Sequence, residues 1–289
     1  MARLCPLFSG SGGNSYYIGS RSAGLLIDAG RSARQLDRML QRCGIDPMAI
    51  QGILITHEHS DHIAGVRVFA KKYGIPVFAS QGTLLAMQPS LEGVESWVLE
   101  GPLQLAGMEV TPFATPHDSA QSLGFRIQTA DGRQFALATD LGVVTPCVRE
   151  HLLGAEFVVL ESNHDREMLR NGPYPAYLKR RILAGTGHLS NGDCAAFLPE
   201  LARAGAKRFL LAPISAGRTT RPPWPGRRPS APFPRRGTRR GQAFGWTWPR
   251  WRTKRARALS FRRGAYAGSQ IDLRGQIEGI LLAGRRGRV

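Results

Sequence analysis

Three histidines and an aspartate occur within six residues in the segment His57-Glu58-His59-Ser60-Asp61-His62. Core packing does not explain this density, because each buried imidazole would need its own hydrogen-bonding partner. Imidazole and carboxylate together are typical ligands of zinc or a similar first-row divalent ion. The segment follows an apolar run with the pattern of a buried strand. We therefore expect His57 and His59 to reach one ion as the strand ends, and Asp61 and His62 to turn towards a second.

The elements that position these residues are predicted from short aliphatic runs and from amphipathic stretches between them. Residues 33–43 and 191–204 place apolar side chains on one helical face. Strands that alternate with such helices predict an α/β layered fold. The strand candidates are residues 24–28, 50–56, 109–113, 123–129, 134–138, 156–160 and 207–211.

Composition predicts a soluble globular protein of the cytoplasm. The chain has 289 residues, of which 42% are hydrophobic. We expect no membrane partner, since no run approaches the roughly 18 apolar residues of a membrane span, and no secretory signal at the start. The cysteines lie far apart, which argues against a disulfide framework and predicts a reducing compartment. They are Cys5, Cys43, Cys147 and Cys194.

Positive charge is concentrated at one end of the chain. Residues 213–289 contain 19 Lys and Arg against 2 Asp and Glu, a net charge of +17, which leaves +1 of the total +18 for residues 1–212. We therefore predict a folded domain over residues 1–212 that is incomplete at its C-terminal end. Residues 213–289 are predicted to be an Arg/Pro/Gly-rich tail that is disordered or misfolded. The near-neutral domain offers no compositional support for DNA binding.

The order of motifs resembles the metallo-β-lactamase fold, whose signature is HxHxDH. The resemblance implies an αββα sandwich, in which two sheets pack face to face with helices outside and metals at the sheet edges. It also implies two divalent ions, zinc or manganese. His57, His59 and His117 would bind one ion, Asp61 and His62 the other, and Asp140 would bridge both. Asp28, at the end of an upstream strand, corresponds to a structural aspartate rather than a ligand.

Four further stretches resemble the bacterial YycJ/WalJ-like branch of that family, at residues 9–15, 161–165, 172–175 and 187–191. The resemblance implies exonuclease action on DNA. Asp61 would orient a hydroxide shared by two ions about 3.5–4 Å apart, which lowers the pKa of that water towards 7. His188 is a candidate for protonating the leaving oxygen or holding a phosphate. For His164 two readings stay open, second-shell support for a metal ligand or substrate contact.

One expected ligand is missing from the sequence. The family supplies a further histidine after a late strand, in this branch in a pattern like Ala-His-Leu-Ser-x-Glu-Asn-Asn. No histidine follows His188. Residues 212–224 can be encoded by a set of codons that contains the expected motif in another reading frame. If two bases are skipped after the codon for Ala212, these codons read His-Leu-Ser-Arg-Glu-Asn-Asn-Ala-Pro-Ala-Leu. We therefore interpret residues 213–289 as translated out of frame. The rival interpretation is a genuine nucleic-acid-binding extension.

The favoured function is a two-metal phosphodiesterase that acts as a DNA exonuclease through a metal-bound hydroxide, impaired by the missing histidine. A small-molecule ester, thioester or lactam hydrolase of the same fold is the alternative, because a fold does not determine a substrate. An inactive chain whose basic tail binds nucleic acid non-specifically is the third possibility.

Overall fold

The computed structural model describes residues 2–212, which form two six-stranded β-sheets. In the first sheet β1 to β3 pair antiparallel, and β3 to β6 pair parallel. In spatial order this sheet contains β1 (Arg3–Phe8), β2 (Ser15–Gly19), β3 (Gly24–Ile27), β4 (Ile50–Leu54), β5 (Val77–Ala79) and β6 (Ser96–Val98).

The second sheet has the same division into an antiparallel and a parallel part. Strands β7 to β10 pair antiparallel, and β10, β11 and β12 pair parallel. Its spatial order is β12 (Arg208–Ala212), β11 (Phe157–Glu161), β10 (Gln134–Ala138), β9 (Leu123–Thr129), β8 (Met108–Ala114) and β7 (Leu103–Leu105). Because parallel neighbours end at the same edge, the residues after β10, β11 and β12 leave the sheet together.

Alternating side chains explain why both faces of each sheet are buried. In β3, Leu25 and Ile27 pack into the core between the sheets, whereas Leu26 packs under the outer helices. In β11, Val159 points between the sheets and Val158 points outward. Strands covered on both faces read as continuous apolar runs, which is why they stand out in the sequence.

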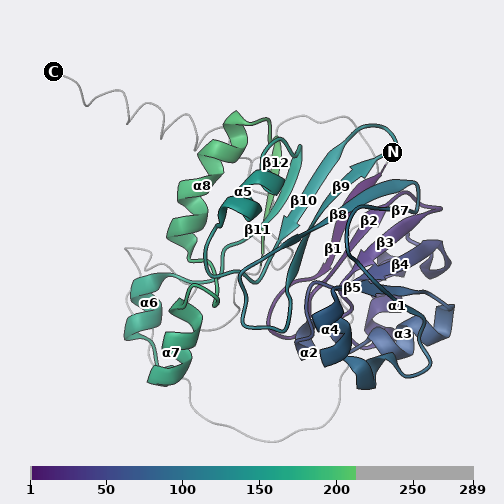
Figure 1. The fold of residues 1–289 in the computed structure, drawn as a ribbon, viewed down its shortest axis with the longest axis horizontal. Helices are drawn as coiled ribbons and strands as arrows, with labels where there is room; N and C mark the ends of the chain where they lie inside the picture. Colours follow the sequence, from purple (N-terminus) through teal and green to yellow (C-terminus); the bar gives the residue numbers. More distant parts are fainter. Residues whose placement is uncertain (1, 213–289) are drawn as a thin grey trace, which may run out of the picture. The chain divides into compact units, whose positions relative to one another are not determined.

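Helices lie outside both sheets, so the layers are helix, sheet, sheet and helix (Figure 1). Beside the first sheet are α1 (Ala33–Arg42), α2 (Ser60–Ile63), α3 (Val66–Tyr73) and α4 (Gln81–Ala86), with the short 3-10 turns Pro47–Ala49 and Gln88–Leu91. Beside the second are α5 (Pro146–Leu152) and α8 (Asn191–Arg203), and between β11 and α8 come α6 (Arg166–Asn171) and α7 (Ala176–Leu183). The predicted αββα sandwich is confirmed.

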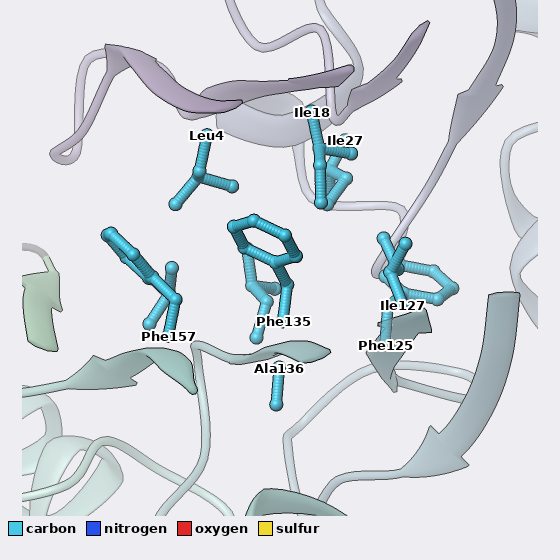
Figure 2. A pocket seen from close by; sticks show the side chains of 10 residues that line it. Leu4, Ile18, Ile27, Phe125, Ile127, Phe135, Ala136 and Phe157 are labelled. Carbon is cyan, nitrogen blue, oxygen red and sulfur yellow. The ribbon is translucent and has the colours of Figure 1, made fainter. Parts of the chain in front are cut away.

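Aromatic and aliphatic side chains fill the space between the sheets. Figure 2 shows Leu4, Ile18 and Ile27 of the first sheet facing Phe125, Ile127, Phe135 and Phe157 of the second, while Ala136 points away. The remaining gap is about 10 Å³. A water needs about 10–15 Å³ together with polar partners, and this gap is lined by apolar side chains. It is therefore core packing and not a ligand site.

All the predicted strands and both predicted helices are present, with boundaries that differ by one or two residues. The strands that the sequence did not indicate are β1, β2, β5, β6 and β7, of which β5 to β7 have three residues each. The interpretation of residues 213–289 lies outside the described residues. Within residues 2–212 no helix has the length and apolar character that crossing a bilayer requires.

We expect Phe125→Ala to destabilise the protein by about 3–5 kcal/mol, because Phe125 is fully buried between the sheets and its loss leaves a cavity. The free energy of unfolding is measured by urea titration. The control is Leu85→Ala on α4, where the side chain is 64% exposed, with an expected change within about 0.5 kcal/mol. Equal losses in the two variants would contradict the assignment of this core.

Candidate metal centre

The histidine-rich segment begins where β4 ends and continues into α2, with His59 as the residue that precedes the helix. Backbone hydrogen bonds from other loops hold it in place. Asn14 N donates to Asp61 O at 2.7 Å, and Ala29 N donates to His62 O at 2.8 Å. Gly30 packs so closely that an added Cβ would lie 1.7 Å from Asp61 O. The turn after β3 therefore fixes the position of the segment that carries the candidate ligands.

Ring nitrogens of three histidines converge on one point beside this segment. His57 Nε2 lies 3.1 Å from His59 Nδ1, and His117 Nε2 lies 3.3 Å from the same atom. His117 comes from the loop after β8 in the second sheet. Ligands about 2.0–2.1 Å from a tetrahedral zinc ion lie about 3.3 Å apart. The two distances from His59 Nδ1 match that spacing, and all three nitrogens lie within 4.8 Å of one another.

Two of these rings, His57 and His117, have a hydrogen-bonding partner at the outer nitrogen. His117 Nδ1 donates to the carbonyl of Gly187 at 3.1 Å, which leaves the lone pair of a neutral ring on Nε2. His57 Nδ1 lies 3.0 Å from the hydroxyl of Thr56. Burial lowers the pKa of both His57 and His117, and neighbouring histidines lower it further. Neutral imidazoles with oriented lone pairs fit a divalent metal.

A second group of possible ligands surrounds His62, which is fully buried. His62 Nε2 lies 3.4 Å from Asp140 Oδ2 and 3.7 Å from Asp61 Oδ2. His57, His62 and Asp140 lie close enough together to share an ion. Burial alone would lower the pKa of His62, but the charges of Asp28 and Asp140 outweigh it and raise that pKa to about 9. The residues present fit a second divalent cation with mixed nitrogen and oxygen ligands.

Asp28 lies behind His62 and holds it. His62 Nδ1 donates to Asp28 Oδ2 at 2.8 Å, and the same carboxylate accepts from the Thr56 backbone at 2.8 Å and from the Thr56 hydroxyl at 2.9 Å. The expectation that Asp28 is structural agrees with this geometry. Asp28 and Asp140 have φ angles of 58° and 55°, a region that non-glycine residues seldom adopt. Such backbone strain is typical of functional sites.

His188 lies next to the second group and is held by Glu161, a residue whose role the sequence did not indicate. His188 Nδ1 donates to Glu161 Oε1 at 2.7 Å, and its ring centre is 5.3 Å from that of His117. Burial lowers the pKa of His188, but the hydrogen bond and charge of Glu161 outweigh it and raise that pKa to about 9. Glu161 ends β11 beside the end of β10, so its place at the strand end was the available signal.

Glu161 is a poor candidate for a third metal position, although Asp140, Glu161 and His188 lie close together. Its Oε2 accepts from the backbone of Leu141 at 2.7 Å and of Leu189 at 3.3 Å. Its Oε1 accepts from His188 and, at 3.2 Å, from Asn163 Nδ2. A fully buried carboxylate with four such donors is already compensated. We assign it to a hydrogen-bond network.

A cavity of about 260 Å³ opens beside these residues. Asp61, Asp140 and His188 line one part of it, and Leu178 and Arg181 of α7 line another. His164 also lines it, and neither of its ring nitrogens has a hydrogen-bonding partner among the described residues. Three of the seven predicted site residues, Asp61, Asp140 and His188, line this cavity, and the other four contact one another or these three.

Comparison with known proteins identifies the family. Residues 24–212 match the β-lactamase superfamily domain. The chain belongs to the metallo-β-lactamase superfamily, as the motifs indicate. It is a metallo-hydrolase of that superfamily with candidate His/Asp metal sites.

Two curated relatives carry the resemblance further. The chain is 37% identical to exodeoxyribonuclease YycJ of Bacillus anthracis over 214 residues, which are 72% of this chain and 81% of the relative. It is 36% identical to exodeoxyribonuclease WalJ of Streptococcus pneumoniae over 216 residues, 72% of this chain and 80% of the relative. The predicted resemblance to the YycJ/WalJ-like branch is confirmed.

Solved structures support the fold. The metallo-β-lactamase fold protein YhfI from Bacillus subtilis has a TM-score of 0.56 at 17% identity, over 74% of this chain and 86% of that one. Zn²⁺-bound PqqB from Methylobacterium extorquens has a TM-score of 0.54 at 16% identity, over 74% of this chain and 98% of that one.

We expect Gly30→Ala to weaken metal binding, because an added Cβ at 1.7 Å must push the Asp61 carbonyl and shift the ligand segment. The metal content after dialysis is measured by mass spectrometry, and bound zinc should fall. Gly101→Ala is the control, since its Cβ would meet nothing within 4 Å. Normal metal content in Gly30→Ala would show that the close contact between Gly30 and Asp61 is not needed to position the candidate ligands.

Proposed function

We propose that this protein is a two-metal phosphodiesterase that removes nucleotides from DNA ends. The observation that carries the proposal is the convergence of His57, His59, His117, His62, Asp61 and Asp140 beside the His188–Glu161 pair. The similarity to two exodeoxyribonucleases supports DNA as the substrate.

Each side chain of the site has a role that its position suits. Zinc or manganese ions held here would supply Lewis acidity and an activated water for attack on a phosphodiester. His57, His59 and His117 would hold one ion, His62 and Asp61 the other, and Asp140 would bridge them. Asp61 is 31% exposed at the cavity, and we assign it to orienting the attacking water. Among the roles assigned here, orienting the water is the only one that requires contact with solvent.

His188 is proposed as the catalytic acid, because a leaving sugar oxygen needs a proton as the P–O bond breaks. Its Nδ1 hydrogen is directed at Glu161, so Nε2 is left to face the leaving group. A buried carboxylate behind an imidazole stabilises the protonated ring and fixes its orientation. Glu161 therefore acts through His188 and is a positioning residue.

We expect His188→Gln to lower kcat for DNA about 10²- to 10⁴-fold, the usual contribution of general acid catalysis. The same variant should hydrolyse bis(p-nitrophenyl) phosphate at close to the parent rate, because p-nitrophenolate leaves without a proton. Glu161→Gln should show the same dependence on leaving group to a smaller degree. An equal loss on both substrates would show that His188 is not the acid.

The assay that decides the reaction class uses end-labelled DNA and a panel of small esters with the metal-loaded full chain. Release of labelled nucleotides supports the proposal. Hydrolysis of a thioester or lactam without any DNA cleavage would instead select the small-molecule hydrolase. Loss of DNA cleavage in Asp140→Asn would show that the activity belongs to this site.

We further propose that residues 213–289 are read out of frame and that the second ion is weakly held for lack of a histidine. Support comes from β12, which pairs with β11 in the register Glu161↔Ala212. Ser162 N also donates to Ala212 O at 2.8 Å. A histidine attached directly after Ala212 would start from the same sheet edge as Asp140 and Glu161.

Pro213→His should therefore tighten the weaker of two zinc-binding steps, by about 10- to 100-fold, the scale on which ligand surroundings affect metal affinity. Zinc titration against a competing chelator measures both steps, and Pro213→Ala is the control. Resequencing the gene across the codons for residues 209–224 tests the frame itself. Identical titrations for the two variants would argue against a missing ligand at this position.

A further inference from the structure

The pair of helices α6 and α7 forms the outer wall of the cavity. Leu178, Arg181 and Ile182, which share one face of α7, line it. In Figure 1 the two helices lie beside each other at the lower left, away from the strands. None of the residues of α7 is buried, and in α6 only Leu169 is. Apart from Leu169, the side chains of these two helices are therefore not there to fill the hydrophobic core.

Positive charge is concentrated on this hairpin. Residues 166–183 contain five Lys and Arg against one Glu, whereas residues 1–212 together have a net charge of only +1. Arg166 pairs with Asp193 and Arg181 pairs with Asp118. For the other three cations of the hairpin, no carboxylate oxygen within residues 2–212 lies within 4.0 Å of the charged nitrogen. These three are Arg170, Lys179 and Arg180.

Two tyrosines accompany the positive charges. Tyr174 lines the cavity in the loop between α6 and α7. Tyr177 is 67% exposed and lies one turn before Arg181 on α7, so the two side chains are neighbours on the helix surface. An exposed aromatic ring close to cations without a carboxylate partner is a combination that binds single-stranded nucleic acid, since the cations contact phosphates and the ring stacks on a base.

We propose that the α6–α7 hairpin is the surface on which an unpaired DNA strand lies as its end enters the cavity; this rests on the proposed function. Arg170, Lys179 and Arg180 contact phosphates, and Tyr177 stacks on a base. The cavity of about 260 Å³ lies just below the usual size of small-ligand sites, about 300–1,000 Å³, so it takes the terminal nucleotide rather than a length of strand. The near-neutral charge of the domain as a whole conceals this local surface.

The first test is photocrosslinking with the metal-loaded full chain. Benzoylphenylalanine replaces Tyr177 in one variant and Trp97 in another, because Trp97 is also exposed but lies on β6 in the other sheet. The probe is a labelled single-stranded phosphorothioate oligonucleotide, which resists cleavage. We expect crosslinking from position 177 to exceed that from 97 by about fivefold or more and to map to the terminal nucleotides, as a stacking contact requires.

Charge reversal tests the phosphate contacts. Arg180→Glu in the position-177 variant should reduce the crosslink, and Arg42→Glu at the end of α1 should not, although both arginines are exposed. The loss should shrink as salt is raised, because phosphate contacts release counterions. Equal crosslinking from positions 177 and 97, or no effect of Arg180→Glu, would overturn the proposal.

Kinetics separates this proposal from the proposed function. Arg180→Glu should raise KM for DNA several-fold, whereas Arg42→Glu at the end of α1 should leave both KM and kcat for DNA unchanged. A parent chain that hydrolyses the small diester but never DNA contradicts the proposed function, whatever the crosslinking shows. If the parent degrades DNA but Arg180→Glu leaves KM unchanged, only the proposal that the α6–α7 hairpin binds DNA is contradicted.

Discussion

The carboxylate of Asp28 is fully buried, and the metal centre depends on how that charge is compensated. A buried carboxylate is costly unless it is paired and hydrogen-bonded. Here it accepts from His62 and twice from Thr56. These contacts join the end of β3 to the end of β4 and to α2. The requirement to satisfy one charge therefore fixes the orientation of His62, a candidate ligand, and the path of the segment that carries other candidate ligands.

The core between the two sheets has a similar consequence at longer range. The first group of candidate ligands combines His57 and His59 of the first sheet with His117 of the second. Asp140, Glu161 and His188 also belong to the second sheet and its connections. The spacing of about 3 Å between nitrogens from the two sides holds only while the sheets keep their separation. Close packing of aromatic rings such as Phe125 and Phe135 provides that constraint.

Substrate choice depends on parts of the molecule that the fold does not require. The superfamily uses one arrangement of ligands for different reactions, so the ligand set by itself does not select DNA. The α6–α7 hairpin offers a physical basis for selection. It carries Arg170, Lys179, Arg180 and Tyr177 on two helices whose other residues, such as Leu169 and Arg181, line the cavity. A neutral domain with a local cationic surface would attract a polyanion at the one place where it can react.

The sequence by itself determined the fold class and the candidate ligands, because both leave short, dense signals. Buried parallel strands such as β4 and β11 are continuous apolar runs, and His57 to His62 concentrate ligand chemistry in one turn. Only the tertiary structure decided which distant residues support them. Glu161 lies 27 positions from His188. Its place at a strand end is a local signal, but the sequence does not show that the carboxylate is buried and accepts hydrogen bonds from His188, Asn163, Leu141 and Leu189. The local positive charge of residues 166–183 was likewise not apparent, because the net charge of residues 1–212 as a whole is close to zero. The surface it forms depends on which helix faces the cavity, and packing determines that.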